Sequence, residues 1–122
     1  MGRKSKKKVL VVEDNPNMSG LLADMLEVFE VESVSASDGI EAMNMVNDRD
    51  FGMVISDLRM PNMTGTELLI AVKDKFPEMP VVLISGYSID SADDETVSLR
   101  ADGFLSKPFK MNELQEVLNR FM

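Results

Sequence analysis

The sequence predicts an α/β domain in which helices cover both faces of a parallel sheet. Short apolar runs rich in β-branched residues alternate with longer stretches in which apolar residues recur every three or four positions. The apolar runs lack polar alternation, which is typical of parallel strands that are buried on both faces. Because the two kinds of segment alternate five times, we expect a doubly wound sheet of five strands with five helices.

The expected strands differ in how strongly the sequence marks them. Continuous apolar runs predict strands over residues 9–12, 51–55 and 81–84. Residues 31–36 and 103–106 have strand length but a weaker apolar pattern. All five segments are short, as is usual for strands of globular domains.

The first helix is expected after Asn15 and Pro16. Asparagine is a preferred N-cap, and proline is favoured at the first helical position because its missing N–H has no partner there anyway. The apolar residues that follow at helical spacing are Met18, Leu21, Leu22, Met25, Leu26 and Phe29. This spacing predicts one apolar face turned toward the sheet.

Three more helices follow from the same periodicity, after Gly39, after Gly65 and at the end of the sequence. Their expected inward residues are Ile40, Met43 and Val46, then Leu68, Leu69 and Val72, then Met111, Leu114, Val117, Leu118 and Phe121. Lys110 is a poor cap for the last helix. Residues 88–100 have sparse apolar positions and four acids between 90 and 95, so we expect a short, mobile helix there.

Composition narrows the classes of protein that the chain can represent. With 122 residues, 44% of them hydrophobic and 28% charged, it has the size and polarity of one soluble domain with a buried core. The absence of cysteine excludes disulfide scaffolds, thiolate zinc sites and cysteine nucleophiles, and it favours an intracellular, cytoplasmic location. No apolar run reaches the length of a membrane span, so we expect no membrane contact.

Charge is divided unevenly along the chain. Residues 1–7 form a basic N-terminal tail, and residues 8–122 are the expected domain. Five of the 13 basic residues precede Val9, so the rest of the chain has eight basic against 21 acidic residues and carries about −13. An acidic surface repels phosphate backbones, which argues against nucleic-acid binding and favours a metal cation as ligand.

Polar residues stand where the expected strands end. Glu13 and Asp14 follow the first strand, Asp57 the third, Ser85 the fourth and Lys107 the fifth. Ligand sites of open α/β sheets lie at the carboxyl ends of the strands. Two carboxylates about 4 Å apart repel by about 4 kcal/mol at an effective dielectric near 20, so such a cluster needs a cation. An all-oxygen site that keeps some water suits Mg²⁺, and Mg²⁺ sites of this type serve phosphoryl chemistry.

Four segments in this order resemble the receiver domains of two-component response regulators: "VVEDN", "VISDLRMPNMTG", "VVLISGY" and "ADGFLSKPF". The resemblance covers residues 8–122. It implies the flavodoxin-like fold, a five-stranded parallel sheet in the order 2-1-3-4-5.

The resemblance also implies roles for the residues at the strand ends. Asp57 would accept a phosphoryl group, and Lys107 would neutralise its oxygens. Asp14 and Asp57 would bind Mg²⁺ together with the backbone carbonyl of Arg59, while Glu13 would hold a metal-bound water.

A conformational switch is implied as well. In the family a hydroxyl moves toward the attached phosphoryl group, here that of Ser85, and an aromatic residue of the fifth strand, here Phe104, turns inward. These movements would bias the surface formed by the fourth helix, the fifth strand and the fifth helix. An output domain or a downstream protein would then bind that surface.

The family further implies a phosphohistidine donor acting in trans, a histidine kinase or a histidine phosphotransfer protein, since the chain has no histidine of its own. It would not be a turnover enzyme, although it would catalyse its own phosphorylation and slow dephosphorylation. The alternative that stays open is a receiver-like interaction module that works without phosphorylation.

Two enzyme or cofactor classes fit less well. An aspartate-nucleophile phosphatase of the haloacid dehalogenase type needs a second aspartate two residues after the first, where this chain has Arg59. A flavin binder of the same fold needs hydroxyls and glycine in its first loop, where this chain has acids.

Overall fold

The structure is a computed structural model, and it describes residues 8–48, 51–60, 62–85, 101–107 and 109–122. The strands are β1 (Lys8–Val12), β2 (Ser33–Ala36), β3 (Phe51–Asp57), β4 (Val81–Ser85) and β5 (Gly103–Ser106). The helices within the described residues are α1 (Pro16–Val28), α2 (Gly39–Asp48), α3 (Gly65–Lys75) and α5 (Met111–Phe121).

All strand pairs are parallel, and the sheet order is β2-β1-β3-β4-β5, so the predicted fold and topology are confirmed. β3 is the central strand. Val12 at the end of β1 lies opposite Ser56, and Asp57 at the end of β3 lies opposite Ile84. This register places the polar residues at the carboxyl ends of β1, β3 and β4 at one edge of the sheet.

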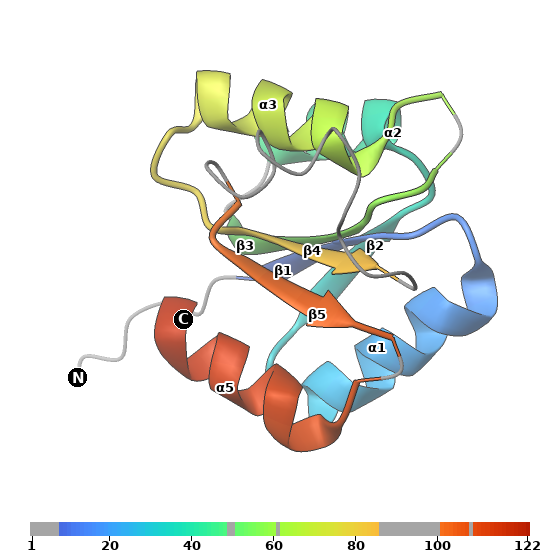
Figure 1. Ribbon diagram of the computed structural model, residues 1–122, viewed down its shortest axis with the longest axis vertical. Coiled ribbons are helices and arrows are strands. Elements are labelled where there is room, and N and C mark those ends of the chain that lie inside the picture. Colours follow the sequence, from blue (N-terminus) through green and yellow to red (C-terminus); the bar gives the residue numbers. More distant parts are fainter. Residues whose placement is uncertain (1–7, 49–50, 61, 86–100, 108) are drawn as a thin grey trace.

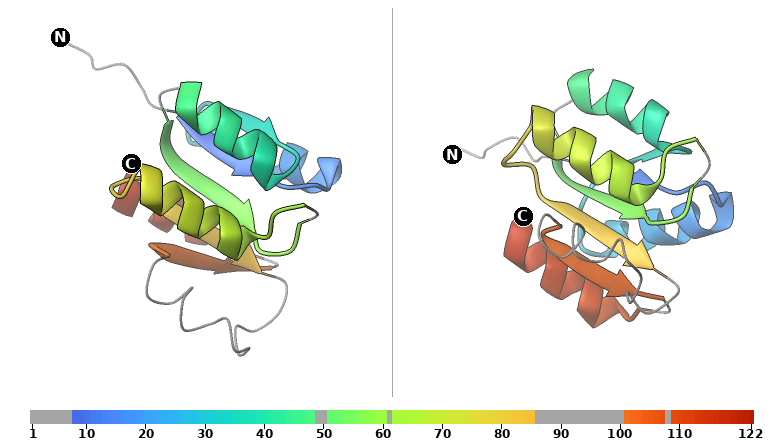
Figure 2. Two further views of the ribbon diagram at one scale, coloured as in Figure 1. Left: turned by 90° about the horizontal axis from the view of Figure 1, so that it is seen from above. Right: turned by 45° about the horizontal axis from the view of Figure 1, so that its top comes forward.

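The sheet separates two hydrophobic cores. Alternate residues of β1 enter different cores, because successive side chains of a strand point to opposite faces: Leu10 and Val12 pack on one side, and Val9 and Val11 on the other. Helices α2 and α3 cover the first face, and α1 and α5 cover the second (Figure 1). The two further views show the same layers, helix over sheet over helix (Figure 2).

The predicted second strand begins two residues later than expected. Its expected start, Val31, instead completes the end of α1, since its N–H donates to the Leu26 carbonyl at 3.0 Å. Glu30 has a φ of 62°, the left-handed conformation that closes many helices. The end of α1 thus takes up the residues that the sequence pattern placed in the strand.

Three predicted inward positions are wrong. Leu21 of α1 is 52% exposed, Ile40 of α2 is 53% exposed, and Met111 at the start of α5 is exposed as well. In α2 the buried face runs through the small residues Gly39 and Ala42, which let the helix approach closely, so Ile40 is turned outward. The other predicted inward residues of these helices are buried or half-buried.

Two helix starts follow the predicted capping pattern, and a third has a capping box that was not predicted. The Asn15 side chain accepts from the N–H groups of Asn17 and Met18 at the start of α1, and Thr64 with Glu67 forms a capping box at the start of α3. Lys110 gives α5 no side-chain cap, as expected, and its N–H donates to Glu113 at 2.7 Å.

Two predicted segments lie outside the described residues: the basic tail of residues 1–7 and the fourth helix within residues 88–100. Among the described helices, none has both the length and the apolar character needed to cross a membrane.

Candidate functional site

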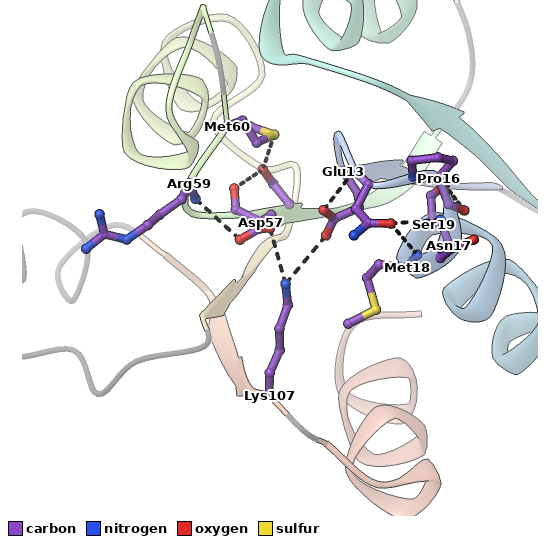
Figure 3. Close-up of polar contacts among 11 residues, drawn as sticks. Glu13, Pro16, Asn17, Met18, Ser19, Asp57, Arg59, Met60 and Lys107 are labelled. Atoms are coloured by element: carbon purple, nitrogen blue, oxygen red, sulfur yellow. Dashed lines mark hydrogen bonds and ion pairs between the residues drawn. The ribbon is translucent and has the colours of Figure 1, made fainter.

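Acidic and basic side chains meet at the carboxyl edge of the sheet, as the strand-end pattern predicts. Glu13 and Asp14 directly follow β1, Asp57 is the last residue of β3, and Lys107 directly follows β5. Figure 3 shows the Lys107 side chain reaching from the end of β5 toward the carboxylates of Asp57 and Glu13. Four residues from three parts of the sequence therefore share one site.

Lys107 is held between two acids. Its Nζ atom donates to Asp57 Oδ2 at 3.2 Å and forms a longer ion pair with Glu13 Oε1 at 3.7 Å. The two carboxylates are nearly buried, with Glu13 4% and Asp57 9% exposed. Asp14 is a third acid nearby, so a single ammonium group faces three carboxylates and cannot neutralise all of them.

Glu13 is placed by backbone contacts on both sides. Its N–H donates to the Ala36 carbonyl at 3.0 Å, which continues the pairing of β1 with β2. Its Oε2 atom accepts from the N–H of Asn15 at 3.2 Å, so the N-cap residue of α1 also orients the acid. The other carboxylate oxygen, Oε1, is buried and has no hydrogen-bond partner, because the Lys107 ammonium is too distant to donate to it.

The surroundings of Glu13 favour its neutral form. Burial raises its pKa from 4.5 to about 7, and the negative charge of Asp57 contributes in the same direction. The Asn15 N–H and the Lys107 charge lower the pKa but do not offset the burial. A cation bound beside Oε1 would favour the carboxylate form and give the unpartnered oxygen a ligand.

Asp57 is fixed by the backbone around it. The Arg59 N–H donates to Asp57 Oδ1 at 3.3 Å, and the Leu58 N–H donates to the Ile84 carbonyl at 3.0 Å. A Cβ atom at Gly65 would lie only 2.5 Å from the Asp57 carbonyl oxygen, so only glycine allows α3 to start this close to the acid. The carboxylate is therefore aimed by β3, by the following turn and by the start of α3.

The three acids together form a possible metal site. Carboxylate oxygens of Glu13, Asp14 and Asp57 all lie within 4.8 Å of one another, and Asp14 is exposed to solvent. Oxygen donors and a solvent-exposed side match the preferences of Mg²⁺ rather than those of zinc, which favours nitrogen and sulfur. The residues present thus fit a hard divalent cation, and the unpartnered Glu13 Oε1 supports the fit.

The other predicted site residues are placed less directly. Arg59 contributes its N–H to Asp57, while Figure 3 shows its side chain extending away from Lys107. Ser85 ends β4 opposite Ser106 in the sheet register, and its side chain lies outside the described atoms. Phe104 is half-buried and packs against the core beneath α2 and α3.

One buried residue beside the acids escaped the sequence interpretation. Ser56 is fully buried, and its hydroxyl donates to the Asp57 carbonyl at 2.9 Å, with Met60 Sδ at 4.0 Å as a second contact. A hydroxyl within an otherwise apolar buried strand was the available signal, because a buried polar group needs a partner.

The sequence profile described as "Response regulator receiver domain" matches residues 9–119. The sensor histidine kinase RcsC of Salmonella typhi is 31% identical over 110 residues, which are 90% of this chain and 12% of the relative. The chain thus spans about an eighth of the length of that curated relative.

Solved structures agree with the profile. The chemotaxis protein CheY4 of Vibrio cholerae is 28% identical and superimposes with a TM-score of 0.88 over 97% of this chain and 100% of that chain. The response regulator TrrA of Thermotoga maritima, solved in complex with Mg²⁺ and BeF, is 29% identical, with a TM-score of 0.88 over 95% of this chain and 99% of that chain.

Proposed function

The chain belongs to the response regulator receiver domain family, and on this basis we propose that Asp57 is its phosphoacceptor, loaded from a phosphohistidine donor in a Mg²⁺-dependent reaction. Receiver domains function in two-component signalling and are typically not turnover enzymes. The single observation that carries the proposal is the position of Asp57, a nearly buried carboxylate 3.2 Å from the Lys107 ammonium and beside two further acids.

In the proposed reaction a carboxylate oxygen of Asp57 forms a bond to phosphorus while the bond from phosphorus to the donor's ring nitrogen breaks. Lys107 stabilises the charge on the transferring oxygens, because its ammonium already lies within hydrogen-bond distance of the acceptor carboxylate. The Arg59 N–H keeps the carboxylate oriented before the donor arrives.

The proposed metal ligands are carboxylate oxygens of Asp14 and Asp57 with the backbone carbonyl of Arg59, and Glu13 would hold a metal-bound water. Mg²⁺ at these oxygens would neutralise negative charge on the phosphoryl group during transfer. The unpartnered Oε1 of Glu13 supports this role, since a water on the metal could donate to it.

The donor is proposed to be a histidine kinase or a histidine phosphotransfer protein in the cytoplasm. The chain contains no histidine, so none of its 122 residues can carry the phosphohistidine. The phosphoryl group would recruit the Ser85 hydroxyl and alter the packing of Phe104, which would bias a surface that includes β5 and α5. An output domain or a downstream protein would bind this surface.

The test is incubation of the purified chain with Mg²⁺ and acetyl phosphate, followed by intact mass measurement. We expect a mass increase of one phosphoryl group that Asp57→Asn abolishes and that Asp24→Asn, an exposed acid of α1, leaves intact. Continuous release of phosphate would instead indicate a phosphatase. No labelling at all would favour an interaction module that works without phosphorylation.

A further inference from the structure

The loop between β3 and α3 is attached to the site at its base. The Leu58 N–H donates to the Ile84 carbonyl at 3.0 Å, and the Gly65 N–H donates to the Leu58 carbonyl at 2.8 Å, which closes the loop. Arg59, the proposed carbonyl ligand, lies within this loop. The position of that carbonyl therefore depends on how the rest of the loop is held.

The far side of the loop is tied to the start of α2. The side-chain amide of Asn62 donates to Asp38 Oδ2 at 3.0 Å, across 24 positions of the sequence. The other oxygen of Asp38 accepts from the Glu41 N–H at 2.8 Å, so the same acid caps α2. The hydrogen bonds from Glu41 and Asn62 lower the pKa of Asp38, so it stays ionised at neutral pH.

Two further features fit the attachment of the loop to the start of α2. Asn62 has a φ of 70°, a left-handed conformation that asparagine tolerates better than most residues. Met63 lies directly against α2, since a Cβ atom at Gly39 would come within 2.8 Å of its side-chain atoms. The loop tip and the first turn of α2 thus fit each other closely at two adjacent positions.

We propose that Asp38 and Asn62 are positioning residues for metal binding at the site, and this inference rests on the proposed function. Their hydrogen bond holds the tip of the β3–α3 loop, while the hydrogen bonds of Leu58 with Ile84 and Gly65 hold its base. Arg59 lies between the two attachments, so its carbonyl is preorganised for the cation. Neither Asp38 nor Asn62 contacts the acids of the site in this arrangement; both act through the loop.

The first test replaces Asn62 by glycine, which keeps the left-handed backbone accessible and removes the side-chain hydrogen bond, although it also gives the backbone more freedom. We expect the half-saturating Mg²⁺ concentration, both in an NMR titration and for phosphorylation by acetyl phosphate, to rise on the order of threefold to tenfold. This is below the roughly 10–100-fold loss typical of partners that bind a metal ligand directly. A purely structural contact would lower the urea midpoint without changing Mg²⁺ affinity.

The matched control is Glu30→Gly, which also replaces an exposed residue of positive φ, at the opposite end of α1 from the site. We expect its Mg²⁺ affinity to equal that of the wild type. If Asn62→Gly also binds Mg²⁺ like the wild type, the positioning role is wrong while the proposed function stands. If the wild type itself shows no Mg²⁺-dependent labelling, the proposed function fails first.

The second test exchanges the two side chains. Asn62→Asp places two carboxylates against each other, and we expect weaker Mg²⁺ binding even though the added charge alone would attract the cation. Asp38→Asn combined with Asn62→Asp restores a hydrogen bond with donor and acceptor reversed and keeps the net charge of the wild type. Recovery of Mg²⁺ affinity in this double variant supports the pairing, and affinity no better than that of Asn62→Asp overturns it.

Discussion

Two lysines of this domain contact acids at opposite ends of the sheet, and they are held in different ways. Lys73 donates to Asp102 Oδ2 at 2.7 Å and to the Met79 carbonyl at 2.8 Å, and the same Asp102 oxygen accepts from the Val81 N–H at 2.8 Å. All three hydrogen bonds of this group are short, so Lys73 and Asp102 are both well paired. It ties α3 to the start of β4 and to the residue before β5.

Lys107 is held more loosely. Its contacts to Asp57 and Glu13 measure 3.2 and 3.7 Å, and within the described part of the chain it has no backbone acceptor. Glu13 keeps an unpartnered oxygen and a pKa raised to about 7. A lysine whose neighbours are fully paired stabilises the fold, whereas one beside unsatisfied acids remains available to bind charge that arrives later.

The largest expected effect comes from Lys107→Ala. We expect the rate of Asp57 phosphorylation by acetyl phosphate to fall on the order of 100-fold, since a preorganised charge at the transferring group is removed. In the presence of Mg²⁺ the free energy of unfolding should change by less than about 1 kcal/mol, because the cation offsets the lost ammonium. A loss of stability as large as that of Lys73→Met would contradict the distinction between the two lysines.

The reverse behaviour is expected for Lys73→Met, which keeps the apolar stem and removes the charge. The Met79 carbonyl loses its donor and Asp102 loses its cation, so we expect a loss of about 1–3 kcal/mol in the free energy of unfolding, measured with urea. The phosphorylation rate should stay within about twofold of the wild type. Lys75→Met, at an exposed position of the same helix, is the control and should change stability by less than about 0.5 kcal/mol.

A further effect should appear in the pH dependence of stability without metal. The pKa of Glu13 rises from 4.5 to about 7 on folding, so the folded state binds more protons between these values. Stability should therefore fall as pH increases from about 4.5 to about 7, which is the opposite of the usual behaviour of a paired acid. Urea midpoints measured across this range should show the slope in the wild type, lose it in Glu13→Gln, and lose it when Mg²⁺ is added.

The sequence predicts the fold and the acids of the site because both depend on local patterns. Apolar runs mark the strands, and their carboxyl ends must share one edge of a parallel sheet, so Glu13, Asp14 and Asp57 could be grouped before any coordinates were known. The resemblance to receiver domains supplied the strand order and the significance of Lys107. These predictions needed no knowledge of how the helices pack.

What could not be predicted depends on packing and on backbone conformation. Ile40 fits a helical apolar pattern, yet the small residues Gly39 and Ala42 face the core in its place. The contact between Asp38 and Asn62 joins distant positions, and Asn62 makes it in the left-handed backbone conformation. An asparagine in a loop is not by itself enough to predict that conformation. The structural role of Lys73 could not be predicted either, because its partners, the Met79 carbonyl and Asp102, come together only in the folded chain.

The position of Asp57 on the central strand has a mechanical consequence. β3 pairs with β1 on one side and, through residues 54–57, with β4 on the other, and α3 begins against the Asp57 carbonyl. Asp57, the proposed acceptor, therefore ends a strand that is hydrogen-bonded on both sides, and we expect it to move little when a new charge is attached. We therefore expect the displacement in the residues packed around the site rather than in β3 itself.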